Sequence, residues 1–147
     1  MPPPGKPTGG FMEYGPLDRL SLVQDRDALA APAFEIQRRG SGLVIVVGPG
    51  TIGPRESAAM LAGTTKVLAD RLPGLRHLVL DLGKARSMSA IGLALCVDLR
   101  NRAAAAGLSP VLAGASGEVM DVLRMMKVER LFNAVRSERD LKQLIGG

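Results

Sequence analysis

Residues 34–146 carry two hydrophobic patterns, one typical of strands and the other typical of helices. Apolar residues at every second position, or in a short β-branched run, predict strands, whereas apolar residues at every third or fourth position predict helices. Strands are predicted at 34–37, 43–47, 76–83, 108–116 and 130–135. Helices are predicted at 54–72, 90–106, 117–128 and 137–147.

The predicted elements follow the order β-β-α-β-α-β-α-β-α. Strands that alternate with helices indicate a mostly parallel sheet joined by right-handed crossovers. Only "RRGSG" (38–42) separates the first two strands, which predicts a hairpin with the first strand at an antiparallel edge. The predicted fold class is therefore α/β, with helices on a mixed, mostly parallel β-sheet.

The first 32 residues differ from the rest in composition. The sequence "MPPPGKPTGG" (1–10) cannot bury apolar surface and is predicted to be disordered, and residues 11–32 are predicted to form a linker or an accessory element. Residues 33–147 are predicted to form one domain. Because 46% of the chain is apolar and only 3% is aromatic, the core of this domain is expected to be aliphatic.

Charge and cysteine content exclude several classes of protein. The net charge is +5, but Lys and Arg are dispersed among acids, so no nucleic-acid partner is expected. A single cysteine, Cys96, rules out an intrachain disulfide and fits a reducing compartment. The longest apolar run, "LVIVV", is far shorter than the ~20 residues of a membrane helix, and the N-terminus lacks the apolar region of a signal peptide. We therefore expect a cytoplasmic protein without membrane insertion.

Two helical stripes are predicted to face the core. The first consists of Ala58, Leu61, Thr65 and Leu68, and the second of Val119, Val122, Leu123 and Met126. Of the neighbouring Met125 and Met126, one is predicted to lie in the core and the other to be partly exposed.

The sequence "DLGKARSMSAIGLALC" (81–96) joins a predicted strand to a predicted helix and contains Ser87 and Ser89. Ser89 directly precedes the helix, so its hydroxyl is expected to cap the first turn. The alternative is that Ser89 or Ser87 accepts a phosphoryl group, because a helix N-terminus stabilises a dianion. Asp81 is expected to bind backbone N–H groups of the loop that follows.

Catalysis is not expected at this loop. A serine nucleophile needs a base within hydrogen-bond reach, and the single histidine, His77, stands at the far end of the preceding strand. One cysteine and one histidine also provide no metal-ligand cluster, so no metal or other cofactor is expected. The chain is therefore predicted not to be an enzyme.

The turn "GPGTIG" (48–53) is a candidate ligand turn, with Gly50, Thr51 and Gly53 as the candidate contacts. It lacks the Lys-Ser/Thr pair of a P-loop, and the neighbouring prolines remove backbone donors. A flexible turn that reverses the chain is the alternative interpretation.

The predicted helix 90–106 is apolar on nearly its whole surface in its first three turns, where only Asp98 and Arg100 are polar. A surface helix normally keeps a polar face, so this helix is covered either by its own domain or by another chain. Met88, Ile91 and Leu93 are predicted to belong to an apolar docking patch. This hypothesis fails if all three side chains are buried within the domain.

The segments "LVLDLGKARSMSAIGLALCVDLRNRA" and "SGEVMDVLRMMKVERLFNAVRSERDL", in this order of elements, resemble the STAS domain. This domain occurs in bacterial anti-sigma factor antagonists, in stressosome proteins and in the tails of some anion transporters. The resemblance covers residues 34–146 and implies a protein-interaction module whose partner is an anti-sigma factor that is also a serine kinase. The implied partner-binding loop and helix start consist of Ser87, Met88, Ser89, Ala90, Ile91, Gly92 and Leu93.

Alignment on Gly92-Leu93 shows a departure from the family pattern. Antagonists resembling this chain have Asp-Ser-Ser before the Gly-Leu pair and are phosphorylated on the first serine, whereas Ser89, Ala90 and Ile91 occupy these positions here. Gly53 falls at a second family acid. The phosphorylation loop is therefore predicted to be degenerate, with docking that is constitutive or gated by Ser89 or Ser87.

Two hypotheses for function follow. The first is a bacterial signalling module, an anti-sigma factor antagonist or related regulatory scaffold, which predicts a flat or convex apolar patch and allows a homodimer if that patch is exposed. The second is a sensor module for a small ligand, a nucleotide or lipid, which predicts a concave pocket between the serine loop and the "GPGTIG" turn.

Overall fold

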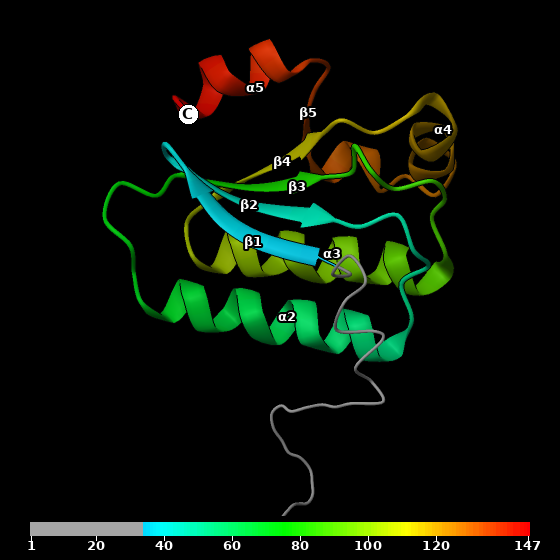
Figure 1. Ribbon diagram of the computed structural model, residues 1–147, viewed down its shortest axis with the longest axis horizontal. Helices are drawn as coiled ribbons and strands as arrows, with labels where there is room; N and C mark the ends of the chain where they lie inside the picture. The colour runs from blue at the N-terminus through cyan, green and yellow to red at the C-terminus, as the bar shows by residue number, and fades with distance from the viewer. Residues whose placement is uncertain (1–33) are drawn as a thin grey trace, which may run out of the picture. The chain divides into compact units, whose positions relative to one another are not determined.

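The computed structural model describes residues 34–147, so the predictions for residues 1–32 lie outside the described part of the chain. Its strands and long helices follow the predicted order, with one short 3-10 helix, η2, in addition (Figure 1). The elements are β1 (Phe34–Arg39), β2 (Gly42–Val47), α2 (Pro54–Ala69), β3 (His77–Asp81), α3 (Ala90–Ala105), β4 (Ser109–Ala113), α4 (Gly117–Met125), η2 (Glu129–Leu131), β5 (Asn133–Val135) and α5 (Glu138–Ile145).

The sheet has five strands in the order β1-β2-β3-β4-β5. β1 pairs antiparallel with β2, with Phe34 opposite Val47, and the other three pairs are parallel. The predicted hairpin and antiparallel edge are thus confirmed. Because β2, β3 and β4 run in the same direction, the loops that follow them lie at one edge of the sheet, on the right in Figure 1.

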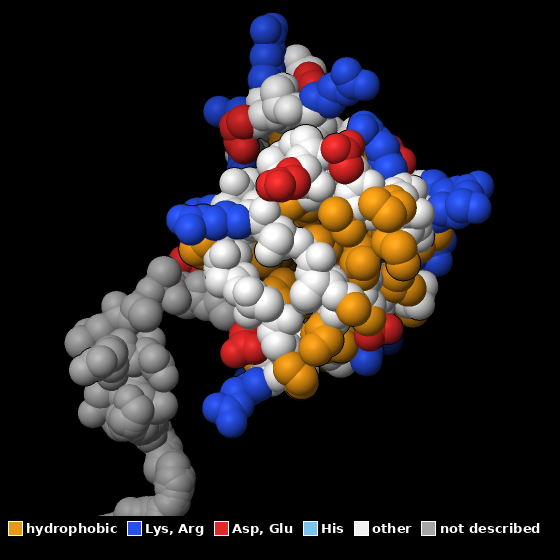
Figure 2. All heavy atoms as spheres, turned by 90° about the vertical axis from the view of Figure 1, so that its right-hand side faces the viewer, with side chains coloured by type: hydrophobic (Ala, Val, Ile, Leu, Met, Phe, Trp, Pro, Cys, Tyr) orange, Lys and Arg blue, Asp and Glu red, His pale blue; other side chains and the backbone are white. Residues whose placement is uncertain are grey.

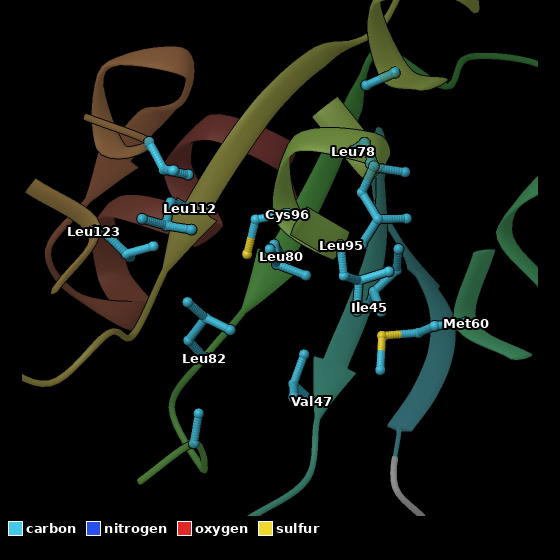
Figure 3. Close-up of a cluster of buried hydrophobic side chains, with 14 of the residues drawn as sticks. Ile45, Val47, Met60, Leu78, Leu80, Leu82, Leu95, Cys96, Leu112 and Leu123 are labelled. Atoms are coloured by element: carbon cyan, nitrogen blue, oxygen red, sulfur yellow. The ribbon is translucent and has the colours of Figure 1, made fainter. Parts of the chain in front are cut away.

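Helices cover both faces of the sheet. Side chains of α2, α3 and α4 share one buried cluster with Ile45 and Leu80, and those of α5 share a second cluster with Val44 and Val79. Figure 3 shows the larger cluster, to which α2 contributes Met60 and the sheet contributes alternate residues of β2 and β3. The alternation along β2, β3 and β4 therefore divides their side chains between two aliphatic cores.

The predicted buried face of α2 is wrong in part. In α2 the fully buried residues are Met60 and Thr64, whereas Ala58 and Thr65 of the predicted stripe are exposed. Ala, Gly, Ser and Thr occur on every side of α2, so the hydrophobic periodicity alone did not identify which side of the helix is buried.

At the end of α4 both methionines are exposed, Met125 by 74% and Met126 by 56%, although one was predicted to be buried. The helix ends at Met125, and Val128, two positions beyond Met126, returns to the core instead. The chain then forms η2, so the last strand begins at Asn133 rather than at the predicted residue 130.

Replacing Thr64 by valine is expected to raise the free energy of unfolding by about 1 kcal/mol, because the Thr64 hydroxyl is fully buried and has no hydrogen-bond partner among the described residues. Urea denaturation measures the change. Thr65→Val is the matched control on the same helix. The Thr65 hydroxyl is exposed and bonded to Leu61 O, so its loss should not stabilise the protein.

Candidate functional site

The two loops singled out in the sequence meet at the carboxyl edge of the sheet. The Ser89 hydroxyl accepts a hydrogen bond from the Gly92 N–H at 3.1 Å, which confirms the predicted cap of α3. The same hydroxyl donates to the Ile52 carbonyl at 3.3 Å. Ser89 therefore both starts the helix and ties it to the "GPGTIG" turn, a link between distant segments that no local pattern could predict.

Two acidic side chains near these loops accept hydrogen bonds from backbone N–H groups. The Asp81 carboxylate accepts a hydrogen bond from the Gly83 N–H at 2.9 Å, as predicted. The Glu56 carboxylate accepts from the Gly53 N–H at 2.9 Å and so caps α2. Gly53 thus helps to begin α2 rather than presenting its N–H to a ligand.

The space between the two loops is a small hollow of about 10 Å³, close to the volume that a single water centre occupies. Gly50 and Thr51 line it, together with Ser87, Met88 and Ser89, whereas Gly53 does not. Ligand pockets are typically about 300–1,000 Å³ in volume. The geometry therefore offers no room for a nucleotide or lipid between these loops.

The predicted docking residues differ in how far they reach solvent. The Ile91 side chain is 38% exposed in the first turn of α3, and Ser87 and Ala90 are also exposed. Met88 and Leu93 are half-buried and pack against the larger core. Hydrophobic side chains gather on the face of the domain that carries these loops (Figure 2). The hypothesis of an apolar patch would have failed if Met88, Ile91 and Leu93 were all buried. Since they are not, the hypothesis stands as a proposal.

The apolar character of α3 is explained mostly by its place in the domain. The helix packs against α2, β3 and β4, and Leu95, Cys96 and Leu99 are buried there. Cys96 is shielded from water, and this desolvation raises the pKa of its thiol to about 12. Burial within the domain does not account for the large apolar side chain of Ile91, which is exposed at the beginning of α3.

Three basic residues are exposed in the segments next to the Ser89 cap: Lys84 and Arg86 in the loop before α3, and Arg55 in the first turn of α2. In the sequence these three residues do not form a cluster, and Lys and Arg as a whole are dispersed among acids. The positive charges of Arg55, Lys84 and Arg86 would complement acidic side chains of a partner at this edge.

A catalytic base is not found near the serines in the described part of the chain. The His77 ring nitrogen Nδ1 lies 3.2 Å from the Ser41 hydroxyl, and His77 begins β3 whereas the serine loop follows its end. Among residues 34–147 there is also no group of three potential metal ligands. The arrangement can dock or be modified, but it provides no pair for nucleophilic catalysis.

The family model for the STAS domain matches residues 26–141. The chain belongs to the STAS domain family. Its fold is similar to that of solved anti-sigma factor antagonists. SpoIIAA in its unphosphorylated form is 14% identical with a TM-score of 0.63, and the match covers 78% of this chain and 98% of SpoIIAA.

Two further structures show the same fold. A candidate antagonist from Thermotoga maritima is 12% identical with a TM-score of 0.62, covering 78% of this chain and 95% of its own. An antagonist from Mycobacterium paratuberculosis is 17% identical with a TM-score of 0.58, covering 81% and 100%. No curated protein sequence matches the chain. Within residues 34–147, none of the helices has the length and apolar character needed to cross a bilayer.

Proposed function

We propose that this STAS chain is a docking module in bacterial signalling, an anti-sigma factor antagonist or a related regulatory scaffold. The observation that carries the proposal is the 38% exposure of Ile91 in the first turn of α3, directly after the Ser89 cap. A large apolar side chain on a rigid helix start is suited to insertion into a partner's pocket. The solved neighbours named as anti-sigma factor antagonists support this class of function.

The partner is an anti-sigma factor or serine kinase-like protein with an apolar pocket bordered by acidic side chains. The pocket receives Ile91, with Met88 and Leu93 at its margin, and the acids pair with Lys84, Arg86 and Arg55. Rim charges of this kind mainly speed association, and the buried apolar anchor supplies most of the affinity. The small-ligand alternative lacks comparable support, because the hollow between the loops holds about 10 Å³.

Docking is not gated at Ala90, which has no hydroxyl to phosphorylate. Of the two remaining candidates, Ser87 is exposed, whereas the Ser89 hydroxyl is part-buried and shared between Gly92 and Ile52. A phosphoryl group on Ser89 would break the link to the turn, because the esterified oxygen has no proton to donate to the Ile52 carbonyl. We therefore assign any phosphorylation that controls docking to Ser87.

The test compares the full-length wild type with Ile91→Asp and with Met125→Asp. The control places the same acid on a methionine that is 74% exposed at the end of another helix, α4. We expect Ile91→Asp to lose the partner by about a hundredfold or more in affinity, because it places a charge in an apolar pocket and opposite acids. Met125→Asp should bind as the wild type does.

Affinity capture from the native cells identifies the partner, and titration calorimetry with the purified partner gives the affinities. If Ile91→Asp and Met125→Asp captured the same proteins as the wild type, the loop would not be the binding site for the partner. Light scattering of the purified chain tests whether the partner is a second copy. Intact-mass analysis of wild type, Ser87→Ala and Ser89→Ala then locates any phosphoryl group, and a mass increase that survives Ser87→Ala would contradict the assignment to Ser87.

A further inference from the structure

A second concave surface lies at the opposite edge of the domain from the serine loop. It is a groove of about 630 Å³ between the carboxyl ends of α2 and α3. Both of these helix ends are on the left in Figure 1. This volume is within the range of small-molecule sites. Its lining includes Thr65, Leu68, Arg71, Leu72, Leu75 and Arg102.

The chemistry of the lining is aliphatic with two positive charges. Leucine and alanine side chains form most of the surface, and Arg71 and Arg102 contribute guanidinium groups. The described residues that line the groove include no acid and no aromatic side chain. A ligand that fits is therefore aliphatic and anionic, whereas a nucleotide base would find no ring on which to stack.

Arg102 is held in position within the groove. Its Nη1 donates a hydrogen bond to the Thr65 hydroxyl at 3.0 Å, and that hydroxyl donates to the Leu61 carbonyl at 2.8 Å. The remaining N–H groups of a guanidinium form a planar fork that matches a carboxylate. Because the Arg102 side chain is already ordered by this bond, it would lose less conformational entropy when it pairs with an anion.

Arg71 occupies a position that favours glycine. It follows Asp70, the C-cap of α2, and has φ +49°, in the left-handed region. Helices commonly end with glycine at this place, because other residues are strained there. From this position the Arg71 side chain contributes to the lining of the groove.

We propose that this groove binds a single-chain aliphatic carboxylate, a medium-chain fatty acid. The carboxylate pairs with Arg71 and Arg102, and the hydrocarbon chain covers Leu68, Leu72 and Leu75. The concave shape favours a small amphiphile over the flat or convex contact of a protein surface. This inference does not depend on the docking function, because it concerns other residues at the other edge of the sheet.

The test uses the full chain and dodecanoate, kept below its micelle concentration. Titration calorimetry measures affinity, and amide chemical shifts in NMR spectra locate the site. Dodecyl maltoside, which has the same chain without the charge, is the ligand control. We expect saturable binding of dodecanoate with shifts centred on the groove, and no comparable binding of the maltoside.

Arg71→Gly and Lys127→Gly form a matched pair of variants. Lys127 also follows a helix C-cap with φ +61°, at the end of α4, so both changes remove one charge and relieve one strained backbone. Both variants should fold with an unchanged or higher Tm. Arg71→Gly should weaken dodecanoate binding about tenfold or more, since it loses a charge-assisted pair, and Lys127→Gly should not.

Several outcomes would overturn the proposal. They are the absence of saturable binding to the wild type, equal weakening by both glycine variants, and shifts that lie outside the groove. Binding of an acidic amphipathic peptide at these residues, without binding of dodecanoate, would instead show a protein interface. Ile91→Asp should leave dodecanoate binding unchanged, so failure here is distinct from failure of the docking function.

Discussion

Replacement of Gly40 by alanine should lower the free energy of unfolding by about 3 kcal/mol or more. Gly40 lies in the turn between β1 and β2 with φ +55°, and a Cβ added there would come within 1.9 Å of the Ile145 carbonyl oxygen. The obstacle is the backbone at the end of α5, which cannot move aside as a flexible side chain can. Urea denaturation of the two proteins measures the loss.

Gly107→Ala is the control for this variant. Gly107 has φ +76°, but an added Cβ would meet no atom within 4 Å, so only backbone strain of about 1 kcal/mol is expected. An equal loss of stability in the two variants would contradict the close contact between the hairpin turn and α5.

The contact between Gly40 and α5 also predicts which helix should unfold locally most often in Gly40→Ala. The Ser41 N–H donates to the Ile145 carbonyl at 2.7 Å, and Leu141 and Ile145 bury the apolar face of α5 in the smaller core. A side chain at residue 40 pushes on this carbonyl. Hydrogen exchange in Gly40→Ala should therefore increase in α5 more than in α3, which belongs to the larger core.

The strands and the order of elements were predictable because their signals are local. The run at 43–47 is continuous and β-branched, and β2 and β3 are indeed buried in the middle of the sheet. Ser89 stands directly before an apolar segment, and it caps α3 as a side-chain acceptor, as predicted. Each of these predictions depends on residues within one turn of one another.

Features that depend on distant segments were not predictable in the same way. The Ser89–Ile52 hydrogen bond and the groove join residues that are far apart in sequence, so only the packing of α2 on α3 brings them together. The exposure of Met126 depends on where α4 ends, and the boundary is decided by Val128 entering the core. Arg71 was not singled out, because its left-handed conformation has no signature in the sequence.

The Cys96 thiol should react with alkylating reagents about a thousandfold more slowly in the native protein than in the unfolded chain at pH 8. The thiolate is the reactive form, and burial raises the pKa of Cys96 from 9.0 to about 12. Only 2% of the residue is exposed, so access slows the reaction further. Rates of iodoacetamide labelling with and without denaturant, followed by mass spectrometry, test this expectation.

The same pKa difference makes stability depend on pH in the alkaline range. Below pH 9 both states keep the thiol proton, and the contribution of Cys96 is fully present. Between pH 9 and about 12 the unfolded chain releases this proton while the folded protein retains it, so the contribution falls by about 1.4 kcal/mol per pH unit. The free energy of unfolding of Cys96→Ala should therefore decrease less steeply with pH than that of the wild type.

Rapid labelling of Cys96 in the native protein would have a consequence for the docking site as well. Cys96 lies between Leu95 and Leu99 on the buried side of α3, little more than one turn after Ile91. A reagent could reach it only if the first turns of α3 separate from the sheet. In that case Ile91 would not be held on a rigid helix start, and the partner would have to order this segment when it binds. Slow labelling, in contrast, supports a docking surface that is already formed in the free protein, with little ordering required on association.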